Sequence, residues 1–253
     1  MIELQGRRAL VTGAAQGLGL AIARLFVERG AQVMLADIDE AGAGKAADEL
    51  GPMARSVRCN VTSAADLARA VEATTQAFGG MDTLINNAGI EIVKPLLDHS
   101  EEEFERIMAI NVKGVFLGMK QSLGALVASG RGSIVNISSL AGVNGVPLFG
   151  CYAASKGAVL QLTRTAAAEL KQAGVRVNAV CPGFIGTAMV DRLIPTVEAA
   201  VGVPFDALVA VKQGRLGTAQ EVAEMTAFLA SDAASWTTGS HYILDGGLSA
   251  GLL

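Results

Sequence analysis

Residues 8–19 read RALVTGAAQGLG and decide the fold of this chain. The first five residues, Arg8–Thr12, are mostly apolar or β-branched and predict a buried strand. The glycines that follow let the backbone turn tightly and approach a pyrophosphate, and the N-terminus of the next helix presents free N–H groups to that anion. Glycine in a turn is weak evidence alone, but its place between a first strand and a first helix predicts a phosphate-binding turn. That turn comprises Gly13, Gln16, Gly17, Leu18 and Gly19.

Short β-branched runs alternate with longer helical stretches along the rest of the chain. Strands are expected at residues 8–12, 32–37, 56–60, 83–86, 133–137, 176–181 and 242–245. The run Ile134–Ile137 is apolar on both faces, which is typical of a parallel sheet covered by helices on each side. The repeated strand-then-helix order predicts a doubly wound parallel α/β fold, formed by residues 1–253 as a single domain, with the ligand beyond the carboxyl ends of the strands.

Two further segments bear on the organisation of the domain. Ser100, with Glu103 three residues later, forms a capping-box pattern, so a long helix is expected to begin there. Residues 186–214 lack a regular pattern and contain Pro195 and Pro204. We interpret that stretch as a mobile substrate flap rather than a boundary between domains.

Composition excludes several classes of function. The chain has 253 residues, of which 51% are hydrophobic and 17% charged, with a net charge of -4 and no basic stripe, so no nucleic-acid surface is expected. The widely spaced cysteines and two histidines predict neither a disulfide framework nor a metal site. Neither a signal peptide nor an apolar span of about 20 residues is visible, so no membrane segment is expected. A reducing, cytoplasmic setting fits best.

Asp37, at the end of the second predicted strand, bears on the choice of dinucleotide. An acid there can accept hydrogen bonds from both ribose hydroxyls of NAD and would repel the extra phosphate of NADP. A unit charge pair at about 4 Å and an effective dielectric constant near 20 is worth up to roughly 4 kcal/mol before screening. Ala14, Ala15, Gln16 and Ile38 supply no cation for that phosphate. NAD(H) is therefore expected over NADP(H), although Asp37 could also be an ordinary helix-capping acid.

Tyr152 and Lys156 point to acid/base chemistry. Their spacing of four residues puts both side chains on one face of a helix. A nearby ammonium favours the phenolate, which lowers the tyrosine pKa toward the range where general acid/base catalysis works best. The alternative is an amphipathic helix that carries the two residues by coincidence.

Together these motifs resemble the short-chain dehydrogenase/reductase family in its short, single-domain form, over essentially the whole chain. The matching segments are Thr12–Gly19, Asn86–Gly89, Asn111, Ile137–Ser139, Tyr152 with Lys156, and Pro182–Gly183. The resemblance implies a seven-stranded Rossmann-type sheet and NAD(P)-dependent oxidation of an alcohol or reduction of a ketone. It also implies a homotetramer or homodimer.

The resemblance assigns roles to four candidate catalytic residues. Tyr152 matches the general acid/base, and Lys156 matches the lysine that lowers the tyrosine pKa and binds the nicotinamide ribose. Ser139 matches the serine that hydrogen-bonds the substrate oxygen. Asn111 matches an asparagine that holds a water molecule in a proton relay, with polar packing inside a helix as its alternative role.

Other cofactor contacts follow from the same resemblance. The segment that runs past the adenosine-ribose side comprises Asn87, Ala88 and Gly89. The residues expected around the nicotinamide carboxamide are Pro182, Gly183, Ile185 and Thr187. The family often has an aspartate and an apolar residue against the adenine, where this chain has Asn60 and Val61. Asparagine offers both a donor and an acceptor, so adenine binding is still expected with its hydrogen-bond pattern open.

The predicted substrate pocket is mostly apolar and favours a hydrophobic secondary alcohol or ketone over a sugar or a free carboxylate. Glu91, after the fourth strand, is either a polar contact in this pocket or a solvated loop acid. The expected substrate contacts are Ser139, Val146, Phe149, Tyr152 and Met189.

Other functions stay open. An NADPH-dependent ketoacyl-carrier or polyol reductase could use the same scaffold, and Arg192, Lys212 and Arg215 are a thin candidate for a carrier-docking patch. A dinucleotide-sensing regulator without catalysis would be expected to lack Tyr152 or Lys156. A halide-binding, dehalogenase-like relative would be expected to lack the glycine turn and the lysine, which are both present.

Overall fold

Parallel strands place the carboxyl ends of the apolar runs along one edge of a sheet. The computed structural model describes residues 2–250, so the first residue and the last three of the expected domain lie outside the described residues. The strands are β1 (Arg8–Thr12), β2 (Gln32–Asp37), β3 (Ala54–Arg58), β4 (Thr83–Asn86), β5 (Ser133–Ile137), β6 (Arg176–Pro182) and β7 (His241–Leu244). They pair in parallel in the order β3-β2-β1-β4-β5-β6-β7. The predicted doubly wound, seven-stranded sheet is confirmed, and its order reverses between β1 and β4, where such folds bind their ligands.

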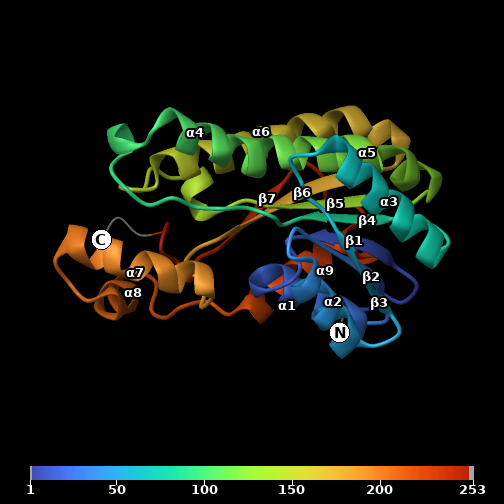
Figure 1. Cartoon of the computed structure of the whole chain (residues 1–253), viewed down its shortest axis with the longest axis horizontal. Helices are drawn as coiled ribbons and strands as arrows, with labels where there is room; N and C mark the ends of the chain where they lie inside the picture. Colours follow the sequence, from blue (N-terminus) through green and yellow to red (C-terminus); the bar gives the residue numbers. More distant parts are fainter. Residues whose placement is uncertain (1, 251–253) are drawn as a thin grey trace.

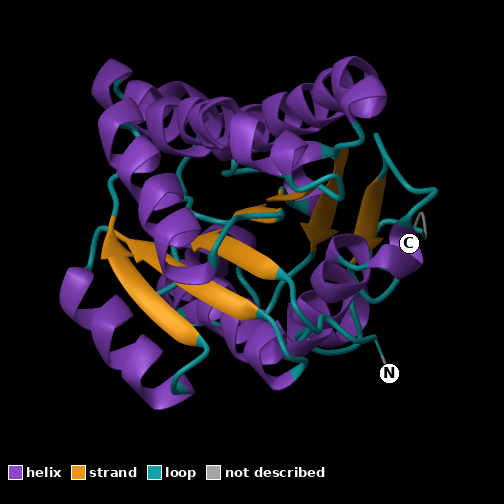
Figure 2. Cartoon of the chain, turned by 90° about the vertical axis from the view of Figure 1, so that its right-hand side faces the viewer, coloured by secondary structure: helices purple, strands orange, loops and turns teal. Residues whose placement is uncertain are grey.

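Helices cover both faces of this sheet. Figure 1 shows α3, α4, α5 and α6 above it and α1, α2 and α9 below it, while α7 and α8 lie together at one end; Figure 2 shows the same layers from the side. The helices are α1 (Gly17–Glu28), α2 (Glu40–Leu50), α3 (Ala64–Phe78), α4 (Glu101–Met108), α5 (Gly114–Ala128), α6 (Gly150–Leu170), α7 (Ala188–Val201), α8 (Phe205–Lys212) and α9 (Ala219–Ala230).

Each face of the sheet has its own apolar core. Phe26 of α1 packs with Val222 of α9 on one side, and Leu67, Leu126 and Val159 of α3, α5 and α6 pack on the other. The five inner strands are almost wholly buried, as the two-sided apolar pattern predicts. The edge strands β3 and β7 are partly exposed, so that pattern does not extend to them.

The third strand lies two residues earlier than predicted. It ends at Arg58, and Asn60 already belongs to the turn that leads into α3. The Asn60 backbone N–H donates to Asp66 at 3.0 Å, and its side-chain oxygen accepts from Thr62 at 2.9 and 3.0 Å. These local bonds replace ladder bonds, which is a usual competition at asparagine and aspartate.

The long helix predicted from Ser100 is interrupted. The capping box of Ser100 and Glu103 is present and begins α4. Residues 109–113 then form a π-helical turn before α5 begins at Gly114. Asn111 lies in that turn, and one extra residue per turn changes the direction in which its side chain points.

The prediction that residues 186–214 are irregular is wrong, because they contain α7 and α8. Pro195 lies inside α7 and cannot donate to the preceding turn, which is why the sequence indicates a break. Burial overrides that loss: Val190, Leu193 and Val197 pack against Phe205 in an apolar cluster. Tertiary packing often decides such cases against local propensity.

Within residues 2–250, no single helix is long and apolar enough to cross a bilayer. The α7–α8 pair, bent by 88°, meets the criterion only when the two helices are counted together.

Candidate active site

The glycine turn joins β1 to α1 and leaves the helix N-terminus free. Gln16, the residue before α1, makes no side-chain capping bond, and the first turn carries no acidic residue. Gly17 has a φ of 59°, and a Cβ added there would project into open space. The N–H groups at the start of α1 can therefore face an anion, and the geometry fits a dinucleotide pyrophosphate.

Two other glycines allow the turn to pack closely. A Cβ at Gly13 would lie 2.8 Å from the Ala88 Cα, and a Cβ at Gly19 would overlap the Gly13 carbonyl oxygen. Asn87 fixes the turn from the end of β4, since its Nδ2 donates to the carbonyls of Thr12 and Gly13 at 2.9 Å each. The structure thus brings the predicted segments at residues 13–19 and 87–89 together.

Asp37 lies at the end of β2 beside the glycine turn. Its Oδ2 accepts the Ala15 N–H at 2.9 Å and its Oδ1 accepts the Asp39 N–H at 3.0 Å. Asp37 is not the N-cap of α2, because Asp39 occupies that position and accepts from Gly42. Each oxygen of the Asp37 carboxylate can accept a second hydrogen bond, so the carboxylate fits a ribose diol.

The neighbouring strand adds a residue that sequence reasoning missed. Arg58 of β3 stands opposite Asp37 in the strand register. Its guanidinium lies 3.7 Å from the Asp66 carboxylate, so part of its charge is already neutralised. Only strand pairing brings this cation near Asp37, and no local sequence signal predicts it.

The remaining predicted cofactor contacts differ in their exposure to solvent and in their hydrogen bonds. Ile38 is exposed, whereas Val61 and Ile185 are buried. The Oδ1 of Asn60 accepts two hydrogen bonds from Thr62, and the adenine contact of Asn60 stays a prediction. Thr187 is the N-cap of α7, and its hydroxyl donates to the Ile185 carbonyl at 3.3 Å. Leu18 packs against the α1 side of the core, and Ala88 packs against the opposite one.

Ser139, Tyr152 and Lys156 converge where β5 ends and α6 begins. Lys156 Nζ donates to the Ile137 carbonyl at 2.9 Å and lies 5.6 Å from the centroid of the Tyr152 ring. Ser139 accepts the Ala141 N–H at 3.1 Å through its Oγ, which orients the hydroxyl in the first turn after β5. The adjacent Ser138 hydroxyl instead donates to the Lys156 carbonyl at 2.9 Å.

Burial dominates the ionisation of this pair. It raises the pKa of Tyr152 to about 12, although the hydrogen bond with Ser139 acts in the opposite direction. Burial also lowers the pKa of Lys156 to about 8. The direction for Tyr152 is opposite to the one expected from the sequence, because desolvation of the phenolate outweighs the hydrogen bond with Ser139.

Asn111 is fully buried and fixes the loop after β4. Its amide accepts the Ile90 N–H and donates to the Ile90 carbonyl, both at 2.9 Å, and also donates to Ser155 at 3.0 Å. Both amide hydrogens are therefore engaged. This geometry accounts for Asn111 as polar packing, while the proton relay stays a prediction.

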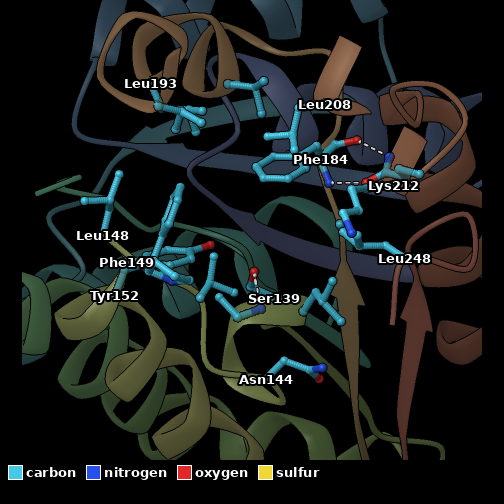
Figure 3. Close-up of a pocket in the computed structure, with 18 of the residues that line it drawn as sticks. Ser139, Asn144, Leu148, Phe149, Tyr152, Phe184, Leu193, Leu208, Lys212 and Leu248 are labelled. Carbon is cyan, nitrogen blue, oxygen red and sulfur yellow. Dashed lines mark hydrogen bonds between the residues drawn. The ribbon is translucent and has the colours of Figure 1, made fainter. Parts of the chain in front are cut away.

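An apolar cavity of about 770 Å³ opens in front of Ser139 and Tyr152. Figure 3 shows these two residues on one wall, with Phe184, Leu193 and Leu208 facing them across the space. All five predicted substrate contacts line it: Ser139, Val146, Phe149, Tyr152 and Met189. Within residues 2–250, Leu148 on this wall is the only non-glycine residue with a positive φ, at 71°, a conformation that costs energy for a leucine.

Several lining residues were missed by sequence reasoning. Leu248 and Ser249 reach the cavity from the segment after β7, and Gln213 reaches it from the end of α8. Gln213 donates to the Phe184 carbonyl and accepts the Phe184 N–H, at 2.8 and 2.9 Å. These contacts join segments far apart in sequence, so neither spacing nor periodicity signals them.

Comparisons with known proteins agree with this geometry. Residues 13–249 match the family described as enoyl-(acyl carrier protein) reductase. The chain is 42% identical to 2,5-dichloro-2,5-cyclohexadiene-1,4-diol dehydrogenase from Sphingobium indicum, covering 99% of this chain and 100% of that one. It is 40% identical to 3-alpha-(or 20-beta)-hydroxysteroid dehydrogenase from Mycobacterium bovis, covering 99% and 92%.

The fold is also similar to that of a solved structure. The crystal structure of a short-chain type dehydrogenase/reductase from Mycobacterium marinum superposes with a TM-score of 0.90 at 36% identity, covering 99% of this chain and 98% of that one. The chain belongs to the short-chain dehydrogenase/reductase family.

Proposed function

We propose that this oxidoreductase transfers hydride between NAD(H) and hydrophobic secondary alcohols or ketones, with Tyr152 as the general acid/base. The observation that carries the proposal is the position of Ser139 and Tyr152 on the wall of an apolar cavity, with Lys156 anchored behind the tyrosine ring. A hydroxyl, a phenol and an ammonium in this order can bind a substrate oxygen and move its proton.

The residues have distinct roles in the oxidative direction. Ser139 hydrogen-bonds the substrate oxygen, and the Tyr152 phenolate accepts the hydroxyl proton. Lys156 supplies the positive charge that stabilises the phenolate. A bound nicotinamide supplies the hydride acceptor, and the glycine turn and Asp37 are the groups proposed to hold the dinucleotide.

Asp37 supports the choice of NAD over NADP. Its carboxylate is oriented by two backbone N–H groups beside the turn, where an additional phosphate would meet like charge. The Arg58 guanidinium would attract that phosphate, but it lies beside the Asp66 carboxylate, which offsets part of its charge.

The cavity lining supports an apolar ring substrate. Aliphatic and aromatic side chains form most of its wall, including Val146, Phe149 and Leu193. Relatives named for a hydroxysteroid and for a chlorinated cyclohexadienediol are consistent with a ring compound.

Two observations weigh against the carrier-linked reductase. Arg215 pairs with Glu221, and Arg192 lies 3.6 Å from the Glu91 carboxylate, so acidic neighbours offset part of the charge of two of the three cations in the candidate docking patch. Lys212 lines the cavity itself. A carrier protein would therefore meet little free positive charge here.

We also propose a homo-oligomer, either a tetramer or a dimer. Phe104 of α4 and Phe116 of α5 are large apolar side chains that the single chain leaves exposed. Light scattering during size-exclusion chromatography tests this, and a purely monomeric peak at micromolar concentration would contradict it.

The direct test of function is a panel of secondary alcohols and ketones, followed at the nicotinamide absorbance with each dinucleotide. Turnover of ring alcohols with NAD, at a higher kcat/KM than with NADP, is expected. Absence of turnover with every alcohol and ketone, in protein that binds NAD, would overturn the proposal.

A further inference from the structure

Glu91 is an acidic side chain buried in the wall of the catalytic cavity. Its side chain is 8% exposed, which excludes the solvated loop acid considered from the sequence. It lines the large cavity together with Ser139 and Tyr152, and it also lines a second cavity of about 220 Å³ with Arg192. An acid in so apolar a lining needs a partner, because burying a carboxylate is costly.

The protein satisfies this carboxylate only in part. Among residues 2–250, its single ion-pair partner is Arg192 of α7, with 3.6 Å between Nη2 and Oε1. That distance is longer than an ordinary charge-assisted hydrogen bond, and the arginine side chain is itself 62% exposed. Burial accordingly raises the pKa of Glu91, more than Arg192 lowers it. The acid retains capacity to accept a hydrogen bond from a ligand.

The backbone holds Glu91 in a fixed place relative to Tyr152. Asn111 clamps both backbone groups of the preceding Ile90. Three residues later, the Lys94 backbone N–H donates to the Leu148 carbonyl at 3.0 Å. A rigidly placed acceptor of this kind selects ligands by position as well as by chemistry.

The charge of Glu91 acts on the catalytic pair. It raises the pKa of Tyr152 and also that of Lys156, so it opposes formation of the phenolate. A hydrogen bond donated to this carboxylate from inside the cavity would weaken that opposition. Arg192 and Lys156 already supply two positive charges to Glu91, which favours a neutral donor over a cationic one.

We infer that Glu91 accepts a hydrogen bond from a second hydroxyl group on the substrate, so that the pocket prefers apolar ring diols to the corresponding mono-alcohols. The first hydroxyl lies between Ser139 and Tyr152, and the second reaches Glu91, which lines the same cavity. This inference rests on the proposed function, because it names the substrate class of that same site.

The test compares matched alcohols: cyclohexanol against the isomeric cyclohexanediols, and indanol against the indanediols. The kcat/KM for each is measured with NAD for the wild type, Glu91→Leu and Glu91→Gln. A hydrogen bond to a charged group predicts that Glu91→Leu lowers the ratio of the best diol to its mono-alcohol by about 10- to 100-fold. Glu91→Gln keeps an acceptor oxygen, so this ratio is expected to fall less in Glu91→Gln than in Glu91→Leu.

Arg192→Leu is the matched control, because it breaks the same ion pair from the other side. If Glu91 only held α7 through Arg192, both variants would lower the rates for diols and mono-alcohols in the same proportion. The inference predicts that Arg192→Leu keeps the diol preference and Glu91→Leu loses it. Circular dichroism and the thermal unfolding midpoint check that each variant is folded.

The outcomes separate this inference from the proposed function. Turnover of mono-alcohols without any diol preference that depends on Glu91 overturns the inference alone. If no alcohol is turned over, calorimetric titration of the same compounds into the NAD-loaded protein decides. If diol binding weakens in Glu91→Leu, the hydrogen bond to Glu91 is upheld although the proposed function fails. If diol binding is the same in the wild type and Glu91→Leu, both the inference and the proposed function are overturned.

Discussion

Lys156 Nζ lies 5.6 Å from the centroid of the Tyr152 ring while it donates a hydrogen bond to the Ile137 carbonyl at 2.9 Å. One turn of α6 sets the spacing of the two side chains, and the end of β5 anchors the ammonium. The lysine is therefore fixed by the sheet rather than by the tyrosine. Burial raises the pKa of Tyr152 and lowers that of Lys156, so the protein without a bound ligand disfavours the phenolate.

The lowered pKa of Lys156 predicts a pH-dependent stability. Between a folded pKa of about 8 and the unfolded value of 10.5, the unfolded chain binds more protons, so this group makes stability rise with pH across that window. Lys156→Met removes the contribution. The unfolding free energy of the wild type minus that of the variant should therefore be larger at pH 9.5 than at pH 7, measured by urea denaturation. A difference that is constant or falls with pH contradicts the assignment.

Gly19→Ala should disrupt the turn between β1 and α1. The added Cβ would overlap the Gly13 carbonyl oxygen, so the turn must shift, and a loss of about 1–3 kcal/mol of unfolding free energy is expected. Binding of NADH, followed by fluorescence, should weaken in the same variant. Gly124→Ala on α5 is the control, because within residues 2–250 the added Cβ would meet no atom within 4 Å beyond its own stretch of helix. Its unfolding free energy should rise by about 0.5–1 kcal/mol. Equal effects at both sites would contradict the packing described for the turn.

Asp37→Ala should change the preference between dinucleotides. Removing the carboxylate removes both the acceptor for the ribose hydroxyls and the repulsion of the additional phosphate, and Arg58 on the neighbouring strand remains. The ratio of kcat/KM for NAD to that for NADP should fall at least tenfold. If the ratio is unchanged, Asp37 does not face the ribose.

Gln213→Leu should loosen the segment after β6. The variant leaves the Phe184 backbone N–H and carbonyl without their partners, at a cost of about 1–3 kcal/mol each if they stay buried. KM for a ring alcohol should rise more than kcat falls, because Phe184 lines the cavity. Gln76→Leu is a suitable control, since within residues 2–250 that exposed side chain hydrogen-bonds only to Glu72 on α3. A change in kcat alone would argue against a positioning role.

Features governed by local chemistry could be predicted from the sequence. The glycine turn, the capping box at Ser100 and the inner strands depend on short patterns, and the structure has them at the expected residues. The helices at residues 186–214 could not be predicted, because their stability comes from Phe205 and other apolar partners rather than from propensity.

Some residues of the candidate site could likewise be predicted from the sequence, and others could not. The sequence predicted Val146, Phe149 and Met189 as pocket residues with Ser139 and Tyr152, and all five line the cavity. It could not predict the burial of Glu91 or the direction of the Tyr152 pKa, since both depend on desolvation by segments distant in sequence. Leu248 reaches the cavity only through the path of the chain after β7.

The most direct test of the central claim is single-turnover hydride transfer in Tyr152→Phe, with the NADH dissociation constant measured on the same protein. Loss of the phenol hydroxyl should lower the rate of hydride transfer by about 10²- to 10⁴-fold while NADH binding stays within a few-fold of the wild type. A variant that binds NADH normally and transfers hydride at close to the wild-type rate would contradict the assignment of Tyr152 as the acid/base.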